Sequence, residues 1–191
     1  MTPVFERLKS ALQLAGIDFT LTHHAPVYTS AEAAAVRGVS LHSGAKALIL
    51  KGEDGFLMAV IPADLALDSN ALRKHLGAKR MRFATKEEVL ELTGLTPGSI
   101  PPFGSLFSLA ARGKSQSVEC GTAVSAVKTR ARRPCHTFHH GLLGTICDTR
   151  LQENERINFN AGSHTDSIQM SYMDYIRHES PTLAEIAKAA T

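Results

Sequence analysis

The spacing of apolar residues predicts four helices in the first half of the chain. Apolar side chains at positions 4, 5, 8 and 12 recur at helical spacing, after Pro3 and before a stop at Gly16. Helices are also predicted at residues 30–37, 68–76 and 85–93, because each of these segments is followed by a glycine. Ser30 can cap the first of them, and a capping box opens the last. Two shorter helices are expected at residues 174–178 and 180–189.

Alternating or continuous apolar runs predict strands, and these lie at residues 17–22, 45–51, 56–62, 80–83, 105–109, 156–159 and 167–172. The sequence Gly52-Glu-Asp-Gly55 between two of these runs indicates a hairpin. Strands and helices are interspersed, and at least one hairpin occurs. We therefore predict an α/β fold with a single mixed, largely antiparallel sheet surrounded by helices.

Neither apolar period continues between residues 110 and 144. Structureless loops of this length are uncommon in compact domains and are usually disordered or functional. From Arg112 to His140 there are six basic residues against Glu119, a net charge of +5, whereas the whole chain carries +3. We predict a basic insertion at residues 110–144, which either contacts RNA phosphates or is a solvated loop without a partner.

Composition predicts a single domain over residues 1–191, because 191 residues with 43% apolar content can fill one hydrophobic core. No apolar run is long enough to span a membrane, and the first residues lack the blocks of a signal peptide, so a cytoplasmic location is expected. Three cysteines without a Cys-x-x-Cys pair are expected to be reduced thiols.

Lys46 stands at the start of an apolar strand, behind Gly44 and Ala45. A lysine in this position is either a strand-edge side chain that reaches water or a desolvated cation in a cleft. In a cleft, its ammonium could bind a phosphate, a carboxylate or a developing oxyanion.

Three prolines and three glycines fall within residues 94–104. Proline fixes φ, whereas glycine lets the backbone approach a ligand closely. The loop is therefore either a stiffened connection or the wall of a site, in which the Gly98 backbone could hold a substrate without a titrating side chain.

The turn Asn160-Ala-Gly-Ser-His164 follows a predicted strand. Gly162 can adopt a positive φ, Asn160 could hold the turn, and Ser163 and His164 could present a hydroxyl and an imidazole to a ligand. A surface turn with an exposed histidine is the alternative. Histidines without such a context are expected to be exposed or to pack, namely His23, His24, His42 and His75.

Other kinds of site find no support in the sequence. It contains no serine-hydrolase elbow, phosphate-binding glycine loop or His-Glu-x-x-His motif. The cysteines and histidines of the basic segment match no standard zinc spacing, namely Cys120, Cys135, His136, His139 and His140. We expect no metal and no cofactor.

In their order and spacing, the Lys46 strand, the Gly98-Ser-Ile-Pro-Pro102 loop and the Asn160–His164 turn resemble the YbaK and prolyl-tRNA synthetase editing-domain family. The resemblance covers most of residues 1–109 and 145–178. It implies a free-standing deacylase that removes a wrong amino acid from tRNA, above all alanine from tRNA(Pro), with cysteine or another residue as the alternative.

The resemblance also implies a metal-free mechanism in which water attacks the ester. Lys46, Gly98 and His164 would be catalytic. The substrate would lie against Ser99, Ile100, Pro101, Pro102, Phe103, Gly104, Asn160, Gly162 and Ser163. The implied partners are aminoacyl-tRNA, with tRNA(Pro) first, and prolyl-tRNA synthetase, whereas no membrane or DNA partner is expected. Two rival functions remain: an inactive module that binds a tRNA end or a small ligand in the same cleft, and a partner protein whose insertion docks RNA, ribosome or synthetase.

Overall fold

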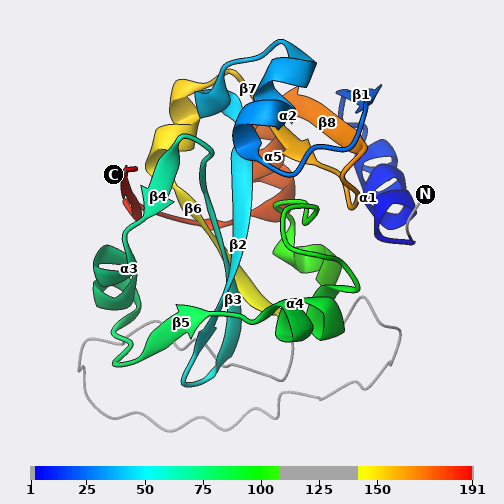
Figure 1. The fold of residues 1–191 in the computed structure, drawn as a ribbon. Coiled ribbons are helices and arrows are strands. Elements are labelled where there is room, and N and C mark those ends of the chain that lie inside the picture. The colour runs from blue at the N-terminus through cyan, green and yellow to red at the C-terminus, as the bar shows by residue number, and fades with distance from the viewer. Residues whose placement is uncertain (1–2, 108–141, 191) are drawn as a thin grey trace, which may run out of the picture.

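The computed structural model describes residues 3–107 and 142–190 (Figure 1). Strands and helices alternate along the chain, which confirms the predicted α/β class. The helices are α1 (Pro3–Leu14), α2 (Ser30–Arg37), α3 (Ser69–Leu76), α4 (Lys86–Thr93) and α5 (Tyr172–Glu179), with short 3-10 helices η1 (Leu41–Ser43), η2 (Gly104–Phe107) and η4 (Thr149–Glu153). The strands are β1 (Phe19–His23), β2 (Ala45–Gly52), β3 (Gly55–Pro62), β4 (Leu65–Leu67), β5 (Met81–Phe83), β6 (Leu142–Asp148), β7 (Arg156–Asn160), β8 (Asp166–Ser171), β9 (Thr182–Ala184) and β10 (Ala187–Ala189). Residues 110–141 of the predicted insertion lie outside the described residues.

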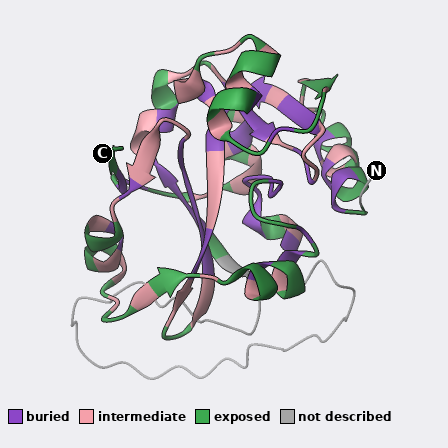
Figure 2. Cartoon of the chain, viewed as in Figure 1, coloured by how far each residue is buried: buried purple, intermediate pink, exposed green. Residues whose placement is uncertain are grey.

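Five strands form the main sheet, in the order β5-β2-β3-β6-β9. β2 and β3 pair antiparallel from Ala45 opposite Pro62 to Gly52 opposite Gly55, which confirms the predicted hairpin. β5 is antiparallel to β2, whereas β6 and β9 are added parallel. β3 lies at the centre of this sheet, and most of its residues are buried (Figure 2).

The other strands form two smaller antiparallel sheets, β1-β8-β7 and β10-β4, so the prediction of one continuous sheet is corrected. The physical reason lies in η4, which turns the chain after β6, so that β7 pairs with β8 and does not extend the main sheet. An isolated bridge between Gly44, just before β2, and Asn158, in β7, joins the main sheet to the β1-β8-β7 sheet. This junction lies two residues from Lys46.

Side-chain caps define the helix ends much as the sequence predicts. α4 has the capping box of Thr85 and Glu88 and ends at Gly94, with φ of 72°. The N-cap of α2 is Thr29 and not Ser30, the residue predicted to cap this helix. Thr29 forms a capping box with Glu32.

Residues 105–107, predicted as part of a strand, belong to the 3-10 helix η2. Phe103 is fully buried, and the Gly104 N–H donates to Thr145 Oγ1 at 3.2 Å, so this segment is anchored in the core and has no strand partner. β6 begins at Leu142, so its first three residues lie within the predicted insertion at residues 110–144, and it has no counterpart among the predicted strands. β4 has no counterpart among the predicted strands.

The predicted helix at residues 180–189 is wrong, because this segment forms β9 and β10. The buried Asp148 carboxylate accepts hydrogen bonds from the backbone N–H groups of Ile186, at 2.7 Å, and Ala187, at 2.6 Å. These bonds hold the segment extended, with β9 paired to β6 and β10 paired to β4. The weak preference of these residues for a helix is overridden by these tertiary contacts. In the part of the chain that the structure describes, no helix is long and apolar enough to cross a membrane.

Candidate functional site

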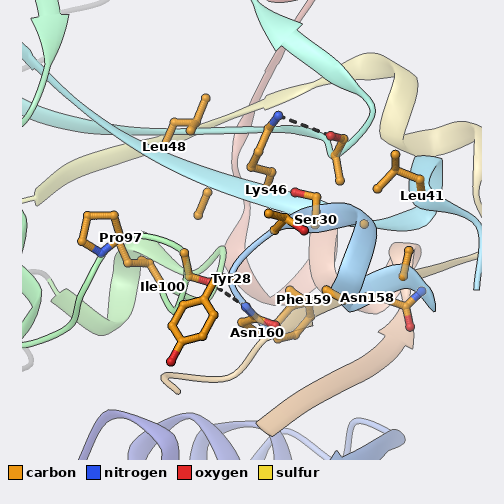
Figure 3. Close-up of a pocket in the computed structure, with 18 of the residues that line it drawn as sticks. Tyr28, Ser30, Leu41, Lys46, Leu48, Pro97, Ile100, Asn158, Phe159 and Asn160 are labelled. Atoms are coloured by element: carbon orange, nitrogen blue, oxygen red, sulfur yellow. Dashed lines mark hydrogen bonds between the residues drawn. The ribbon is translucent and has the colours of Figure 1, made fainter. Parts of the chain in front are cut away.

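A cavity of about 300 Å³ opens between α2, β2, β7 and the glycine-proline loop (Figure 3). This volume is at the lower end of the range for small-molecule sites. Its uncharged polar lining includes Thr29, Ser30, Ser40, Asn158 and Asn160, and its apolar lining includes Ala33, Ala47, Leu48, Ile49 and Ile100.

Lys46 lines the cavity from β2. Its Nζ donates to the carbonyl oxygens of Leu65, at 2.8 Å, and Ala63, at 3.4 Å, which lie on either side of Asp64. Burial lowers the pKa of Lys46, and the charge of Asp64 acts in the opposite direction. An ammonium has three N–H donors, and the bonds to described residues use two of them, so the third can meet a ligand.

Gly98 faces the cavity with φ of 91°, in the left-handed region that favours glycine. Its carbonyl accepts a hydrogen bond from Asn160 Nδ2 at 2.6 Å, and the Gly162 N–H donates to the Ser99 carbonyl at 2.9 Å. The loop and the turn that the sequence marked separately are therefore fixed to each other.

Arg37, at the end of α2, also lines the cavity. It donates from Nε to Ser167 Oγ at 2.8 Å and from Nη2 to Asn160 Oδ1, and burial lowers its pKa to about 10. It therefore stays protonated at neutral pH. Within residues 3–107 and 142–190, Arg37 and Lys46 are the charged side chains that line the cavity, and no carboxylate lines it. This lining favours an anionic ligand.

His164 and Ser163 lie behind the cavity wall and do not line it. The His164 ring is held between Thr96 Oγ1, 3.1 Å from Nε2, and the Val27 carbonyl, 3.0 Å from Nδ1. A Cβ added to Gly98 would lie 3.3 Å from His164 Cε1. The Ser163 hydroxyl donates to Asp166 at 2.6 Å. These contacts shape the turn and support the Gly98 loop from behind.

The second half of the glycine-proline loop packs into the core. The ring of Phe103 lies 5.5 Å from that of Phe159 and 5.3 Å from that of Tyr175, whose hydroxyl donates to the Pro102 carbonyl at 3.0 Å. Of the predicted site residues, Lys46, Gly98, Ile100 and Asn160 line the cavity. Those outside its lining are Ser99, Pro101, Pro102, Phe103, Gly104, Gly162, Ser163 and His164.

Among the cavity residues that sequence reasoning missed are Tyr28, Arg37 and Asn158. Asn158 left a signal, because an amide between two apolar residues of a predicted strand is unusual; it is buried and donates to Ser43 Oγ at 3.0 Å. Arg37 left none, since a basic residue in the last turn of a helix is ordinary.

Asn160→Asp is expected to lower the rate of any reaction in this cavity roughly tenfold, because one hydrogen bond is lost and a carboxylate would face the Gly98 carbonyl. The contact with Arg37 survives the change, so the melting temperature should stay close to that of the wild type. The measurement is turnover together with thermal unfolding.

Asn70→Asp is the matched control. Asn70 also accepts a hydrogen bond from an arginine, Arg73, but it is exposed on α3 and does not line the cavity. Equal turnover in the two variants would contradict a role for the bond between Asn160 and Gly98.

The arrangement of sheets, helices and loop is that of a known class of fold. A solved structure described as a candidate trans-editing enzyme for prolyl-tRNA synthetase has a TM-score of 0.72, with 99% of each chain covered and 19% sequence identity. At this identity the likeness shows the fold alone.

Sequence comparison relates part of the chain to a known family. Residues 24–113 match the model of the aminoacyl-tRNA editing domain. The chain is 29% identical over 190 residues to the multifunctional Ser/Thr-tRNA deacylase ProXp-y of Escherichia coli (strain K12), covering 97% of this chain and 93% of that protein. It is 39% identical over 79 residues to the proline–tRNA ligase of Thermotoga neapolitana, covering 41% of this chain and 14% of that protein. The match over residues 24–113 confirms the resemblance to the editing-domain family that the sequence motifs predicted.

Proposed function

We propose that this protein is a trans-editing enzyme that hydrolyses the ester of mischarged aminoacyl-tRNA. The observation that carries the proposal is a cavity of about 300 Å³ that is lined by two cations and, among the described residues, by no carboxylate. Such a cavity suits a small amino acid attached to a polyanion. The name of the Escherichia coli relative, a tRNA deacylase, supports the same activity.

The proposed reaction needs little from the protein beyond orientation and charge. Water adds to the ester carbonyl carbon and the bond to the ribose oxygen breaks. One proton of the water returns to the ribose oxygen to regenerate its hydroxyl, and the amino acid leaves as a carboxylate with release of the other proton. Lys46 directs its remaining N–H to the negatively charged part of the substrate, and the Gly98 backbone, held by Asn160, positions the reacting groups. The His164 ring lies behind this backbone, where a Cβ added to Gly98 would come within 3.3 Å of its Cε1 atom.

The cavity favours serine and threonine as the amino acids removed. Hydroxyl and amide groups of Thr29, Ser30 and Asn158 lie in its lining and can pair with a side-chain hydroxyl. The relative named as a Ser/Thr-tRNA deacylase points in the same direction. Alanine on tRNA(Pro), which the motifs implied, is the second candidate, because much of the lining is apolar, with several alanine, leucine and isoleucine side chains.

A deacylation panel tests the proposal. We expect Ser-tRNA and Thr-tRNA to be hydrolysed fastest and Ala-tRNA(Pro) more slowly, with Cys-tRNA(Pro) and correctly charged Pro-tRNA(Pro) as comparisons. A site that pairs with a hydroxyl discriminates strongly against the analogue that lacks it. Release of labelled amino acid is the measurement, with and without prolyl-tRNA synthetase.

Faster release of alanine than of serine would reverse the proposed substrate order. Binding of aminoacyl-tRNA without release of any amino acid would contradict the enzymatic proposal and identify a binding module.

A further inference from the structure

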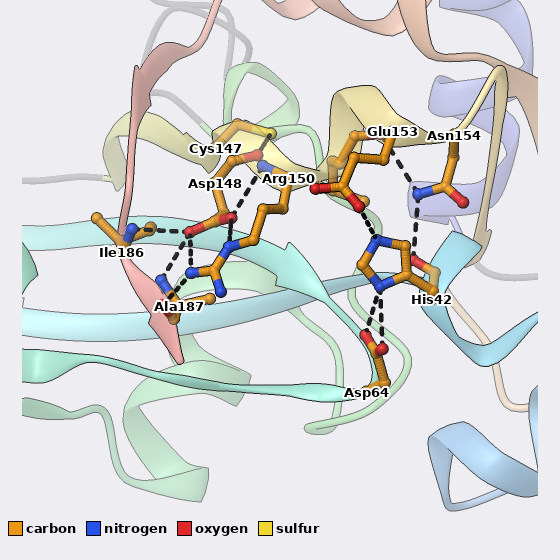
Figure 4. A network of polar contacts seen from close by, with 10 residues as sticks. His42, Asp64, Cys147, Asp148, Arg150, Glu153, Asn154, Ile186 and Ala187 are labelled. Carbon is orange, nitrogen blue, oxygen red and sulfur yellow. Dashed lines mark hydrogen bonds and ion pairs between the residues drawn. The ribbon is translucent and has the colours of Figure 1, made fainter. Parts of the chain in front are cut away.

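His42 belongs to a polar cluster outside the cavity lining, together with Asp64, Glu153 and Asn154 (Figure 4). His42 lies in η1, three residues before β2, and the other three come from the turn between β3 and β4 and from the end of η4. The sequence marked His42 only as an exposed or packing residue.

The first step of the argument is how Asp64 is held. His42 Nδ1 lies 3.0 Å from Asp64 Oδ1 and 2.9 Å from Oδ2, so a proton on this nitrogen is shared with both oxygens of the carboxylate. On the other side of the ring, Nε2 lies 3.3 Å from Glu153 Oε2. The Asn154 amide donates to the His42 carbonyl at 3.4 Å.

The second step is what Asp64 holds. The carbonyl groups that accept from Lys46 Nζ belong to Ala63 and Leu65, the residues immediately before and after Asp64. The Ala63 N–H in turn donates to the Gly44 carbonyl at 2.8 Å, and a Cβ at Gly44 would lie only 2.7 Å from the Ala63 side chain. Little room is therefore left for this turn to shift without moving Lys46.

We infer that His42 is a positioning residue for Lys46, acting through the carboxylate of Asp64 and the two carbonyl groups that flank it. This inference rests on the proposed function, in which Lys46 meets the substrate. His42 itself does not line the cavity.

Charge supports the same arrangement. The groups that face the His42 ring are the carboxylates of Asp64 and Glu153 and the backbone of Arg150, and together they raise its pKa above the ordinary value, with the Asp64 hydrogen bond first. Lys46 is the cation that faces Asp64 from β2. A raised pKa means that the protonated ring stabilises the fold at pH values below the ordinary histidine pKa, and that this stability is lost as pH rises through the raised pKa.

The test compares His42→Ala, His42→Gln, Asp64→Ala and the double variant His42→Ala with Asp64→Ala. We expect His42→Ala to lower kcat roughly 10- to 100-fold, the order of loss caused by misplacing a reacting group, with KM nearly unchanged. Glutamine can donate to Asp64 and should restore most of kcat. The double variant should lose no more than either single variant, because both break the same connection. His75→Ala, an exposed histidine on α3, is the control with wild-type kinetics.

A second measurement needs no activity. Lysine side chains are dimethylated with a ¹³C label, the Lys46 signal is assigned with Lys46→Arg, and its pKa is followed by NMR. In His42→Ala the Lys46 pKa should rise towards the ordinary lysine value, since a released turn lets the ammonium reach water.

Wild-type kcat in His42→Ala, or losses that multiply in the double variant, would overturn the inference. If the wild type released no amino acid from any tRNA, the proposed function would fail, and the NMR measurement would decide about His42 alone. An unchanged Lys46 pKa would then overturn the inference.

Discussion

Lys46→Ala is expected to reduce deacylation by about 100- to 1,000-fold, the range for removing one preorganised donor to developing charge. Lys46 Nζ is already held by two carbonyl groups and therefore needs no reorganisation during the reaction. Partial burial disfavours the charged form and lowers the pKa of Lys46, so the loss of this ammonium should cost little stability. Turnover and thermal unfolding are measured on the same preparation.

Lys51→Ala is the matched control for this change. Lys51 lies on the same strand, forms an ion pair with Glu88 at 2.7 Å and does not line the cavity. It should retain wild-type turnover, because its side chain lies outside the cavity lining and a partly exposed ion pair contributes little to the stability of the fold. Near wild-type turnover in Lys46→Ala would show that the site is assigned wrongly.

Gly98→Ala should lose activity more than stability. The residue has φ of 91°, where a side chain adds strain of roughly 1–3 kcal/mol, and its new Cβ would lie 3.3 Å from His164 Cε1. The His164 ring is held at both nitrogens and cannot easily yield, so the loop must move and carry the Gly98 backbone away from its position. We expect a loss of kcat of roughly 10- to 100-fold.

Gly94→Ala separates backbone strain from the contact at the site. Gly94 also has a positive φ, of 72°, but a Cβ there would meet nothing within 4 Å. It should lose roughly 1–2 kcal/mol of stability and keep its turnover. If both variants lost stability equally and both stayed active, the glycine-proline loop would be a connection and not part of the site.

The hydrophobic pattern was sufficient to predict the hairpin of β2 and β3 and most helix ends, because caps and two-residue turns are local. It could not predict η2 or the last two strands. Phe103 is fixed by the distant rings of Phe159 and Tyr175, and Ile186 is fixed by the Asp148 carboxylate, 38 residues away in the chain. Contacts of this kind override local propensity and leave no trace in a short window of sequence.

In the candidate site, too, some features follow from the local sequence and others depend on distant contacts. Local sequence left both ordinary and site roles open for Lys46, Gly98 and Asn160, and the resemblance to the editing-domain family selected the site roles. Which half of the glycine-proline loop faces the cavity depends on the burial of Phe103, and the presence of Arg37 depends on how α2 lies beside β7. Both are properties of the packed molecule.

The bonds from Ile186 and Ala187 to Asp148 also set an order of events during synthesis. Asp148 is fully buried, and an ionised carboxylate without these N–H donors would be costly to keep away from water. β6, which Asp148 ends, can therefore be enclosed in its final form only after the segment at residues 182–189 has been made. Lys46, Gly98 and Asn160 all precede that segment, so the ribosome has already synthesised the whole cavity lining before the fold that supports it can close.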